Sequence, residues 1–353
     1  MTAATSRYDA DRLPVAHRAV RALSTPGGAI YLLLGVLLVL LFLDNPSLGE
    51  SGQFMRFVGR TAPIAIVALG QYFVIVSGEL DLSMGAVISA QVVLAGNVIG
   101  QHADRVLPVM VLMLVVGIVI GILNGILTTL FRVPSFIATL GTTLIVSGVT
   151  FYWTGGAPSG NPIDSFRAIG RAGIDNVPLL GFVPYSVIIL VVLVGAAIWL
   201  MRRPFGRLLL SVGDNQAATA LTGASVWWLR TRAFILSSIA STIAAVILVG
   251  YAGVSPVVGQ GYEFIAITAV VLGGAALGGG RGWVLSAIAA AFALEVLFSL
   301  LDFVGVQSTW RPAVQGVIIV VALGAPLLRW RRGRRNPETT VVPSPSPGET
   351  AGD

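Results

Sequence analysis

Long apolar stretches separated by short polar segments run through most of this chain. Ten of them lie at about 29–44, 58–77, 80–100, 107–131, 134–154, 183–201, 232–252, 263–279, 283–302 and 311–328. A helix needs roughly 20 apolar residues to cross a bilayer, and most of these stretches come close to that length. The pattern predicts an all-α, polytopic integral membrane protein with about ten transmembrane helices.

Arginine positions give the predicted spans an orientation. With the amino terminus inside, the inner segments hold sixteen arginines and the outer segments hold six. Because cytoplasmic loops of membrane proteins carry the excess of basic residues, this division favours ten spans with both termini in the cytoplasm. The net charge of +6 then follows from topology, and no nucleic-acid partner is needed to explain it.

The polar segments divide the chain into three regions. We predict a cytoplasmic segment 1–28, a membrane domain 29–328, and a basic, then disordered cytoplasmic tail 329–353. Within the membrane domain, an outer loop at about 155–182 separates two groups of five spans. An odd number of spans in each group inverts the second half relative to the first, which permits an inverted repeat of two five-helix halves.

Composition excludes several kinds of chemistry. Cysteine is absent and all 22 basic residues are arginine, so the chain has no disulfide, no thiolate metal site and no P-loop lysine. The two histidines, His17 and His102, lie far apart in polar segments, so we expect no metal site and no cofactor. We therefore expect that this chain is not an enzyme and that it does not hydrolyse ATP itself.

Eight glycines lie between Gly259 and Gly282, around an apolar stretch. Glycine loses the most conformational entropy on ordering. Eight glycines in one stretch therefore indicate close helix packing, a break in a helix, or backbone that lies against a moving partner. The candidate packing or gating residues are Gly273, Gly274, Gly278, Gly279, Gly280 and Gly282.

The inner loop at about 202–231 contains a turn signal at Gly213, Asp214 and Asn215. A short helical run follows from Gln216 to Leu221 and ends before Gly223, with Asn215 as its N-cap. A short capped helix on this face could dock into another protein. Alternatively, the loop is a solvated connector whose arginines lie on lipid headgroups.

Carboxylates near or within the spans form a further set of candidates. Glu79 and Asp81 lie between the second and third apolar stretches, where Asp81 with Ser83 can cap the start of the third span or contact a substrate or proton. Glu295 lies near the middle of the ninth stretch, so it must pair, be protonated or line a wet path.

Four ordered segments resemble the membrane-spanning permease subunit of ribose-type sugar importers of the ABC class. They are APIAIVALGQYFVIVSGELDLSMGA at 62–86, GILNGILTTLFRVPSFIATLGT at 121–142, GDNQAATALTGASV at 213–226, and the glycine-rich stretch 259–282. Glu79 stands where many members have a small or apolar residue, and Ala275 and Ala276 stand where Thr-Ser is frequent.

The resemblance implies a function and partners. The chain would form the translocation path for a monosaccharide or small polyol in the bacterial inner membrane. Its partners would be a second permease subunit, identical or not, cytoplasmic ATPase subunits, a periplasmic or lipid-anchored sugar-binding protein, and membrane lipid.

The resemblance also assigns roles to residues. It makes Gly213, Asp214, Asn215, Ala217, Ala218 and Gly223 the loop that couples to the ATPase. It places the start of a motif helix at Gly78, Glu79, Asp81, Ser83 and Gly85, and it leaves Asn124 and Glu295 as intramembrane polar candidates.

The alternative is an ion- or proton-coupled secondary transporter of a small polar solute. Such a transporter would also have ten spans and inverted halves, and Glu295, Glu79 or Asp81 could carry protons. It would need no ATPase. An intramembrane enzyme is disfavoured because the spans contain no HExxH motif, no cysteine and no serine near a histidine.

Overall fold

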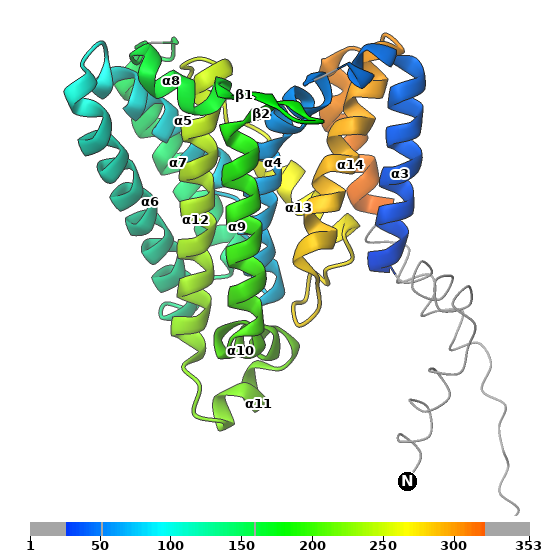
Figure 1. Ribbon diagram of the computed structural model, residues 1–353. Helices are drawn as coiled ribbons and strands as arrows, with labels where there is room; N and C mark the ends of the chain where they lie inside the picture. The colour runs from blue at the N-terminus through cyan, green and yellow to red at the C-terminus, as the bar shows by residue number, and fades with distance from the viewer. Residues whose placement is uncertain (1–25, 51, 159, 322–353) are drawn as a thin grey trace, which may run out of the picture.

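The computed structural model describes residues 26–50, 52–158 and 160–321, and Figure 1 shows the arrangement of its elements. Along the chain these are α3 (Pro26–Asp44), η2 (Pro46–Gly49), α4 (Gln53–Val76), α5 (Met84–Leu94), η3 (Ala95–Ile99), η4 (Ala103–Arg105), α6 (Val106–Thr129), α7 (Ser135–Thr154), α8 (Asp164–Arg171), β1 (Gly173–Val177), β2 (Gly181–Pro184), α9 (Tyr185–Arg202), α10 (Pro204–Asp214), α11 (Gln216–Leu221), α12 (Val226–Tyr251), α13 (Tyr262–Leu272), α14 (Val284–Phe303) and η5 (Ser308–Trp310). A further helix covers Arg311–Val321. The predicted tail 329–353, the end of the tenth stretch and most of segment 1–28 lie outside the described residues.

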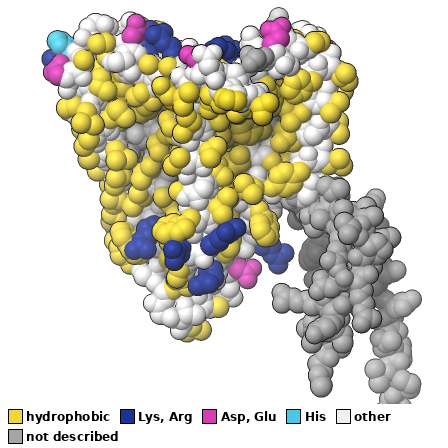
Figure 2. Space-filling view, viewed as in Figure 1, with side chains coloured by type: hydrophobic (Ala, Val, Ile, Leu, Met, Phe, Trp, Pro, Cys, Tyr) yellow, Lys and Arg dark blue, Asp and Glu magenta, His cyan; other side chains and the backbone are white. Residues whose placement is uncertain are grey.

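The described part is helical and suited to a membrane. Six of its helices are long and apolar enough to span a bilayer: α4, α6 with the turn before it, α7, α9, α12 and α14. Figure 2 shows a broad hydrophobic belt between two ends where charged side chains gather. The prediction of a helical, polytopic membrane protein is confirmed. The sequence did not predict the antiparallel hairpin of β1 and β2, which lies in the loop before α9.

Two predicted spans are wrong in their boundaries. The third was expected from residue 80, but α5 begins at Met84 and residues 79–83 are not helical. The eighth was expected to reach residue 279, but α13 ends at Leu272. Gly274 and Gly279 both have a φ of +87°, a left-handed conformation that interrupts a helix. Hydropathy detects apolar residues and does not detect these breaks.

Two long helices, α4 and α12, form the centre of the bundle. About 83% of the apolar window of α4 and 78% of that of α12 are buried, against 17–28% for α6, α7 and α9. The short helices α5 and α13 pack on the central pair: α5 contacts α12 and α7, and α13 contacts α4 and α14. Both α5 and α13 therefore lie against the central helix from the other half of the chain.

Three glycines spaced four residues apart bring α6 against α12. A Cβ built on Gly121 would lie 2.6 Å from the Cα of Ile235, and one on Gly125 would lie 2.7 Å from the Cα of Thr231. One on Gly117 would lie 2.4 Å from Thr242 Oγ1. Since the spacing places all three on one face of α6, this face can approach the backbone of α12 closely.

We expect Gly121→Ala to destabilise the protein, because the added methyl group would meet helix backbone that cannot move aside alone. Overpacking of this kind costs about 1–3 kcal/mol. The matched control is Gly141→Ala on α7, where a Cβ would meet nothing within 4 Å. Thermal unfolding in detergent should show a lower midpoint for Gly121→Ala alone. Equal midpoints for the two variants would contradict the proposed role of the α6 glycine face.

Candidate functional site

The non-helical segment 77–83 joins α4 to α5 inside the bundle, and α7 satisfies its backbone. The N–H of Leu80 donates to Ser135 Oγ at 3.1 Å, and the N–H of Leu82 donates to Thr139 Oγ1 at 3.1 Å. The hydroxyl of Thr143 donates to the carbonyl of Leu82 at 2.9 Å. Ser135, Thr139 and Thr143 are spaced four residues apart, so one face of α7 replaces the hydrogen bonds that a helix would supply.

Asp81 is fully buried and is the centre of a polar cluster. Its Oδ1 accepts from the N–H of Ser83 at 2.9 Å and from Ser83 Oγ at 2.6 Å. Its Oδ2 accepts from Ser237 Oγ of α12 at 2.6 Å. The carboxylate thus joins the segment 77–83 to the central helix α12. A buried carboxylate needs such partners, because an unpaired one is costly.

The same cluster extends to α6 and α7. Asn124 Nδ2 donates to Ser83 Oγ at 2.9 Å, and Thr142 Oγ1 donates to Asn124 Oδ1 at 2.6 Å. We call Asp81, Ser83, Asn124, Thr142 and Ser237 the polar cluster. Ser83 is the N-cap residue of α5, but its side chain makes no capping hydrogen bond to that helix. The hydroxyl instead connects Asp81 to Asn124.

Three glycines from three different motifs meet at the end of α4. A Cβ on Gly213 of α10 would lie 2.1 Å from the carbonyl oxygen of Val76, and one on Gly279 would lie 2.6 Å from the Cα of Gly213. The same position on Gly279 is 2.7 Å from the backbone nitrogen of Gly78. The N–H of Gly280 donates to the carbonyl of Val76 at 2.9 Å. We call Gly78, Gly213 and Gly279 the glycine joint.

An ion pair lies beside the glycine joint. Arg230 Nη1 of α12 is 2.8 Å from Glu79 Oε1, and the two side chains are only 15% and 13% exposed. Arg230 Nε also donates to the carbonyl of Ser77 at 3.3 Å. The pair therefore fastens the start of the segment 77–83 to the first turns of α12.

The loop 202–231 leads into the glycine joint. The predicted helix Gln216–Leu221 is present as α11, and Asn215 Oδ1 accepts from the N–H of Ala218 at 2.9 Å as its N-cap. Gly223 follows it with a φ of +80°. The predicted turn at Gly213 and Asp214 is wrong, because both residues belong to the end of α10. Gly213 is needed for its close contact with α4 rather than for a turn.

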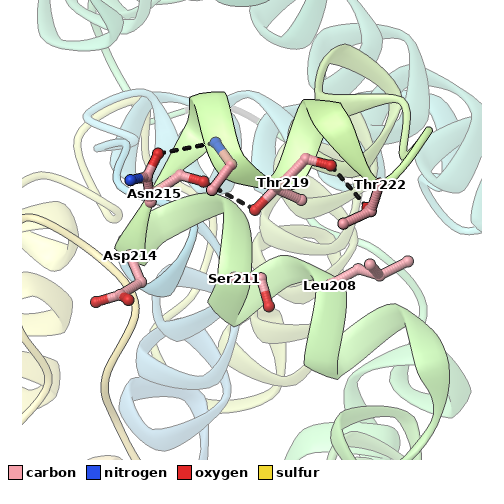
Figure 3. Close-up of a pocket in the computed structure, with 7 residues that line it drawn as sticks. Leu208, Ser211, Asp214, Asn215, Thr219 and Thr222 are labelled. Carbon is pink, nitrogen blue, oxygen red and sulfur yellow. Dashed lines mark hydrogen bonds between the residues drawn. The ribbon is translucent and has the colours of Figure 1, made fainter.

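A polar groove of about 260 Å³ separates α10 from α11, as Figure 3 shows. Its lining residues are Leu208, Ser211, Asp214, Asn215, Ala218, Thr219 and Thr222. Ala217 and Ala218 are exposed on α11, and Leu221 is 90% exposed. An apolar side chain exposed to this degree beside a polar groove is suited to contact with another protein.

A second close contact joins α5 to α13, and it includes a residue that the sequence analysis did not single out. A Cβ on Gly85 would lie 2.1 Å from Glu263 Oε2 and 2.5 Å from the carbonyl oxygen of Gly259. The N–H of Gly259 donates to Ser89 Oγ at 3.0 Å. The buried Oε2 of Glu263 has no hydrogen-bond partner among the described residues. The place of Glu263 in the first turn of α13, two residues after Gly261, was the available signal.

The remaining predicted residues are more dispersed. Glu295 lies on α14, where its carboxylate is within electrostatic range of Arg311 and Tyr262, so it belongs to a different region from Asn124. Gly273 packs against Ser286 of α14, with its Cβ position 2.6 Å from the Ser286 carbonyl oxygen. Gly278 has nothing within 4 Å of its Cβ position.

Comparison with known proteins decides between the alternatives that the sequence leaves open. Residues 53–323 match the protein family described as "branched-chain amino acid transport system / permease component". The chain belongs to this family of permeases. It is therefore the permease subunit of an ABC importer, which has no catalytic activity of its own, since a separate subunit hydrolyses ATP. The resemblance stated from the motifs is confirmed.

Several curated relatives match most of the chain. The ribose import permease protein RbsC of Bacillus subtilis (strain 168) is 31% identical over 302 residues, or 83% of this chain and 90% of the relative. The probable ABC transporter permease protein YphD of Escherichia coli (strain K12) is 32% identical over 312 residues, or 87% and 91%. The autoinducer 2 import system permease protein LsrC of Klebsiella pneumoniae is 28% identical over 288 residues, or 81% and 82%. None of the solved structures matches this chain.

We expect Gly213→Ala to disturb the glycine joint, because its methyl group would lie 2.1 Å from the Val76 carbonyl oxygen and push α10 away from α4. The thermal midpoint and the ATP turnover of the assembled importer should both fall. Gly278→Ala, in the loop after α13 that carries Gly279, is the matched control and should change neither, since its Cβ position is open. An unchanged thermal midpoint and an unchanged ATP turnover of Gly213→Ala would contradict the close contact between α10 and α4.

We expect Arg230→Glu to reduce ATP turnover stimulated by the binding protein by about tenfold or more, because it places two carboxylates together where water screens them poorly. The double variant Glu79→Arg with Arg230→Glu should recover most of the loss. Arg232→Glu is the matched control, since Arg232 is exposed and its guanidinium lies 4.9 Å from the centre of the Trp228 ring. If the ATP turnover of the double variant is as low as that of Arg230→Glu, the ion pair between residues 79 and 230 is not needed for coupling.

Proposed function

We propose that this chain forms the translocation path of an importer for a monosaccharide or a related small polyol. The relatives named for ribose import support this substrate class, since they align over more than four fifths of this chain. The relative named for autoinducer 2 import indicates that the family also serves other small solutes, so the substrate panel should extend beyond pentoses and hexoses.

The observation that carries the coupling part of the proposal is the glycine joint. There the end of α10, the end of α4 and the loop after α13 come within backbone contact. An ATPase subunit bound at α10 and α11 would therefore act on the segment 77–83 through packed backbone. The polar cluster includes Asp81 and Ser83 of that segment and connects it to α6, α7 and α12.

We further propose ten spans arranged as two inverted halves, with α10 and α11 in the cytoplasm. The division of arginines supports the orientation. The repeat is supported by a shared pattern: a long central helix, a non-helical segment, and an eleven-residue helix occur as α4 with α5 and again as α12 with α13. Half-length helices of this kind are typical of inverted-repeat transporters.

The proposed partners follow from the same arrangement. Two copies of this permease, or this chain with a related one, would form the path in the bacterial inner membrane. ATPase subunits would bind at the groove of α10 and α11. A periplasmic or lipid-anchored binding protein would deliver the solute to the opposite face.

The proposal predicts that this chain copurifies with its ATPase in mild detergent and that a sugar-loaded binding protein stimulates ATP turnover. Leu221→Asp should abolish the association, because it places a charge on the apolar residue that α11 exposes. Leu179→Asp is the matched control, since Leu179 is fully exposed on the hairpin at the opposite face.

Two results would contradict parts of this proposal. Normal ATPase association of Leu221→Asp would exclude α11 as the docking element. Stimulation by none of the pentoses, hexoses or polyols in the panel would exclude the proposed substrate class and leave the permease function intact.

A further inference from the structure

The segment 252–261 joins α12 to α13 without forming a helix. It starts after Tyr251, whose hydroxyl donates to the carbonyl of Arg60 at 3.1 Å, near the end of the bundle that carries the hairpin of β1 and β2. The segment then passes η3, since a Cβ on Gly96 would lie 2.6 Å from Val254 Cγ1. The chain therefore runs back from the hairpin end of the bundle along η3 and α5.

The segment ends near the middle of the bundle. A Cβ on Gly85, the second residue of α5, would lie 2.5 Å from the carbonyl oxygen of Gly259. The neighbouring Met84 lies against α4, because a Cβ on Gly70 would be 3.1 Å from Met84 Cε and 2.7 Å from Ala240 Cβ. Ala240 is near the middle of α12, which is long enough to span a bilayer. The end of the segment therefore lies at the depth of the hydrocarbon region.

Several backbone groups of this segment need partners. Among the described residues, no donor forms a hydrogen bond with the carbonyl groups of Gly253, Val254, Pro256 and Val258. Lipid tails cannot supply one. Non-helical backbone at membrane depth is found where other protein buries it or where it lines a water-filled space.

The described part of the chain does not bury this segment completely. Val257 is 47% exposed and Phe264, in the first turn of α13, is 49% exposed. Gln260 is exposed between them. Beside these residues, the Oε2 atom of Glu263 has no hydrogen-bond partner among the described residues. An amide, an aromatic ring and unpaired acceptors therefore lie close together along one short stretch of chain.

We propose that residues 252–261 and Phe264 form a wall of the solute path, from the hairpin end to the middle of the membrane. This inference rests on the proposed function, which supplies the class of solute and puts the hairpin end outside the cell. The hydroxyl groups of a sugar or polyol donate to the free carbonyls and to the amide of Gln260. The Phe264 ring gives the carbon face of the solute an apolar surface.

The wall is continuous with the elements that reach the proposed ATPase side. Gly261, with a φ of +91°, is the residue before α13, and the loop after α13 carries Gly279 of the glycine joint. A displacement at the glycine joint is transmitted along the eleven residues of α13 to the wall. The solute path and the coupling loop thus lie at opposite ends of one short helix.

The absence of cysteine makes the wall directly testable, because each introduced cysteine is the only thiol of the permease chain. Val257→Cys, Gln260→Cys and Phe264→Cys are made separately in the importer assembled with its ATPase in nanodiscs. The probe is a charged, water-soluble methanethiosulfonate, which reacts with the ionised thiol. The mass of the permease chain reports the modification, and unchanged ATPase association shows that each variant is folded.

Two control variants set the scale of reactivity. Asp104→Cys is exposed in η4 and should react fast, whereas Val149→Cys is on the regular helix α7, where Val149 is 62% exposed and needs no water. We expect Val257→Cys and Gln260→Cys to react within about tenfold of Asp104→Cys, and Val149→Cys to react about a hundredfold more slowly. If both wall variants are as slow as Val149→Cys, the segment faces lipid or a dry contact with a second subunit, and the proposal is overturned.

Uptake by proteoliposomes tests whether the solute uses this wall. After complete modification, Gln260→Cys should lose ATP-driven uptake of the pentoses, hexoses and polyols of the panel, while Asp104→Cys should keep it. Undiminished uptake by modified Gln260→Cys would overturn the wall and leave the proposed function standing. If the unaltered chain binds its ATPase but takes up none of these solutes, the proposed substrate class fails, while the measured reactivity of the thiols still decides whether the segment faces water.

Discussion

The non-helical segment 77–83 carries backbone groups that no regular helix satisfies, and the bundle around it is built to satisfy them. Water cannot reach such groups in the hydrocarbon region, where each unpaired one costs several kcal/mol. The hydroxyls of α7 bond the backbone, and Asp81 binds the hydroxyls of Ser83 and Ser237. Because α6, α7 and α12 all contribute, the segment also fixes these helices relative to one another.

The glycines at the end of α4 depend on the same non-helical segment. An interrupted helix leaves room at its end, and the glycine joint fills that room with backbone from α10 and from the loop after α13. Three backbones at this distance exclude side chains, so a displacement of one must be taken up by the others. The exposed loop that contains α11 and a buried carboxylate are thereby joined through few intervening atoms. This argument explains why motifs far apart in the sequence contain glycine at these positions.

The sequence predicted local features well and tertiary ones poorly. Asn215 and the helix 216–221 were recognised because a capping residue acts on its own neighbours, and the structure has the same bounds. Gly213 was taken for a turn residue, since nothing near it in sequence reveals that Val76 lies against it. The early start predicted for α5 has the same origin, because residues 80–83 look apolar enough for a helix until α7 offers their backbone other partners. Glu263 was overlooked because its neighbour Gly85 lies on another helix.

The central helices α4 and α12 are held together by buried side chains along their length and by polar contacts at both ends. Both α4 and α12 are buried along most of their length, so neither can tilt without displacing its neighbours. Asp81 bonds Ser237, and Glu79 pairs with Arg230, so the segment after α4 is fastened to α12 at two depths. At the opposite end Tyr251 bonds the backbone of Arg60 and fastens the pair again. Polar contacts at both ends, and the close approach of Gly70 on α4 to Ala240 on α12 between them, favour movement of α4 and α12 as a unit. The interrupted helices α5 and α13, with glycines at their ends, are then the elements best suited to move against that unit.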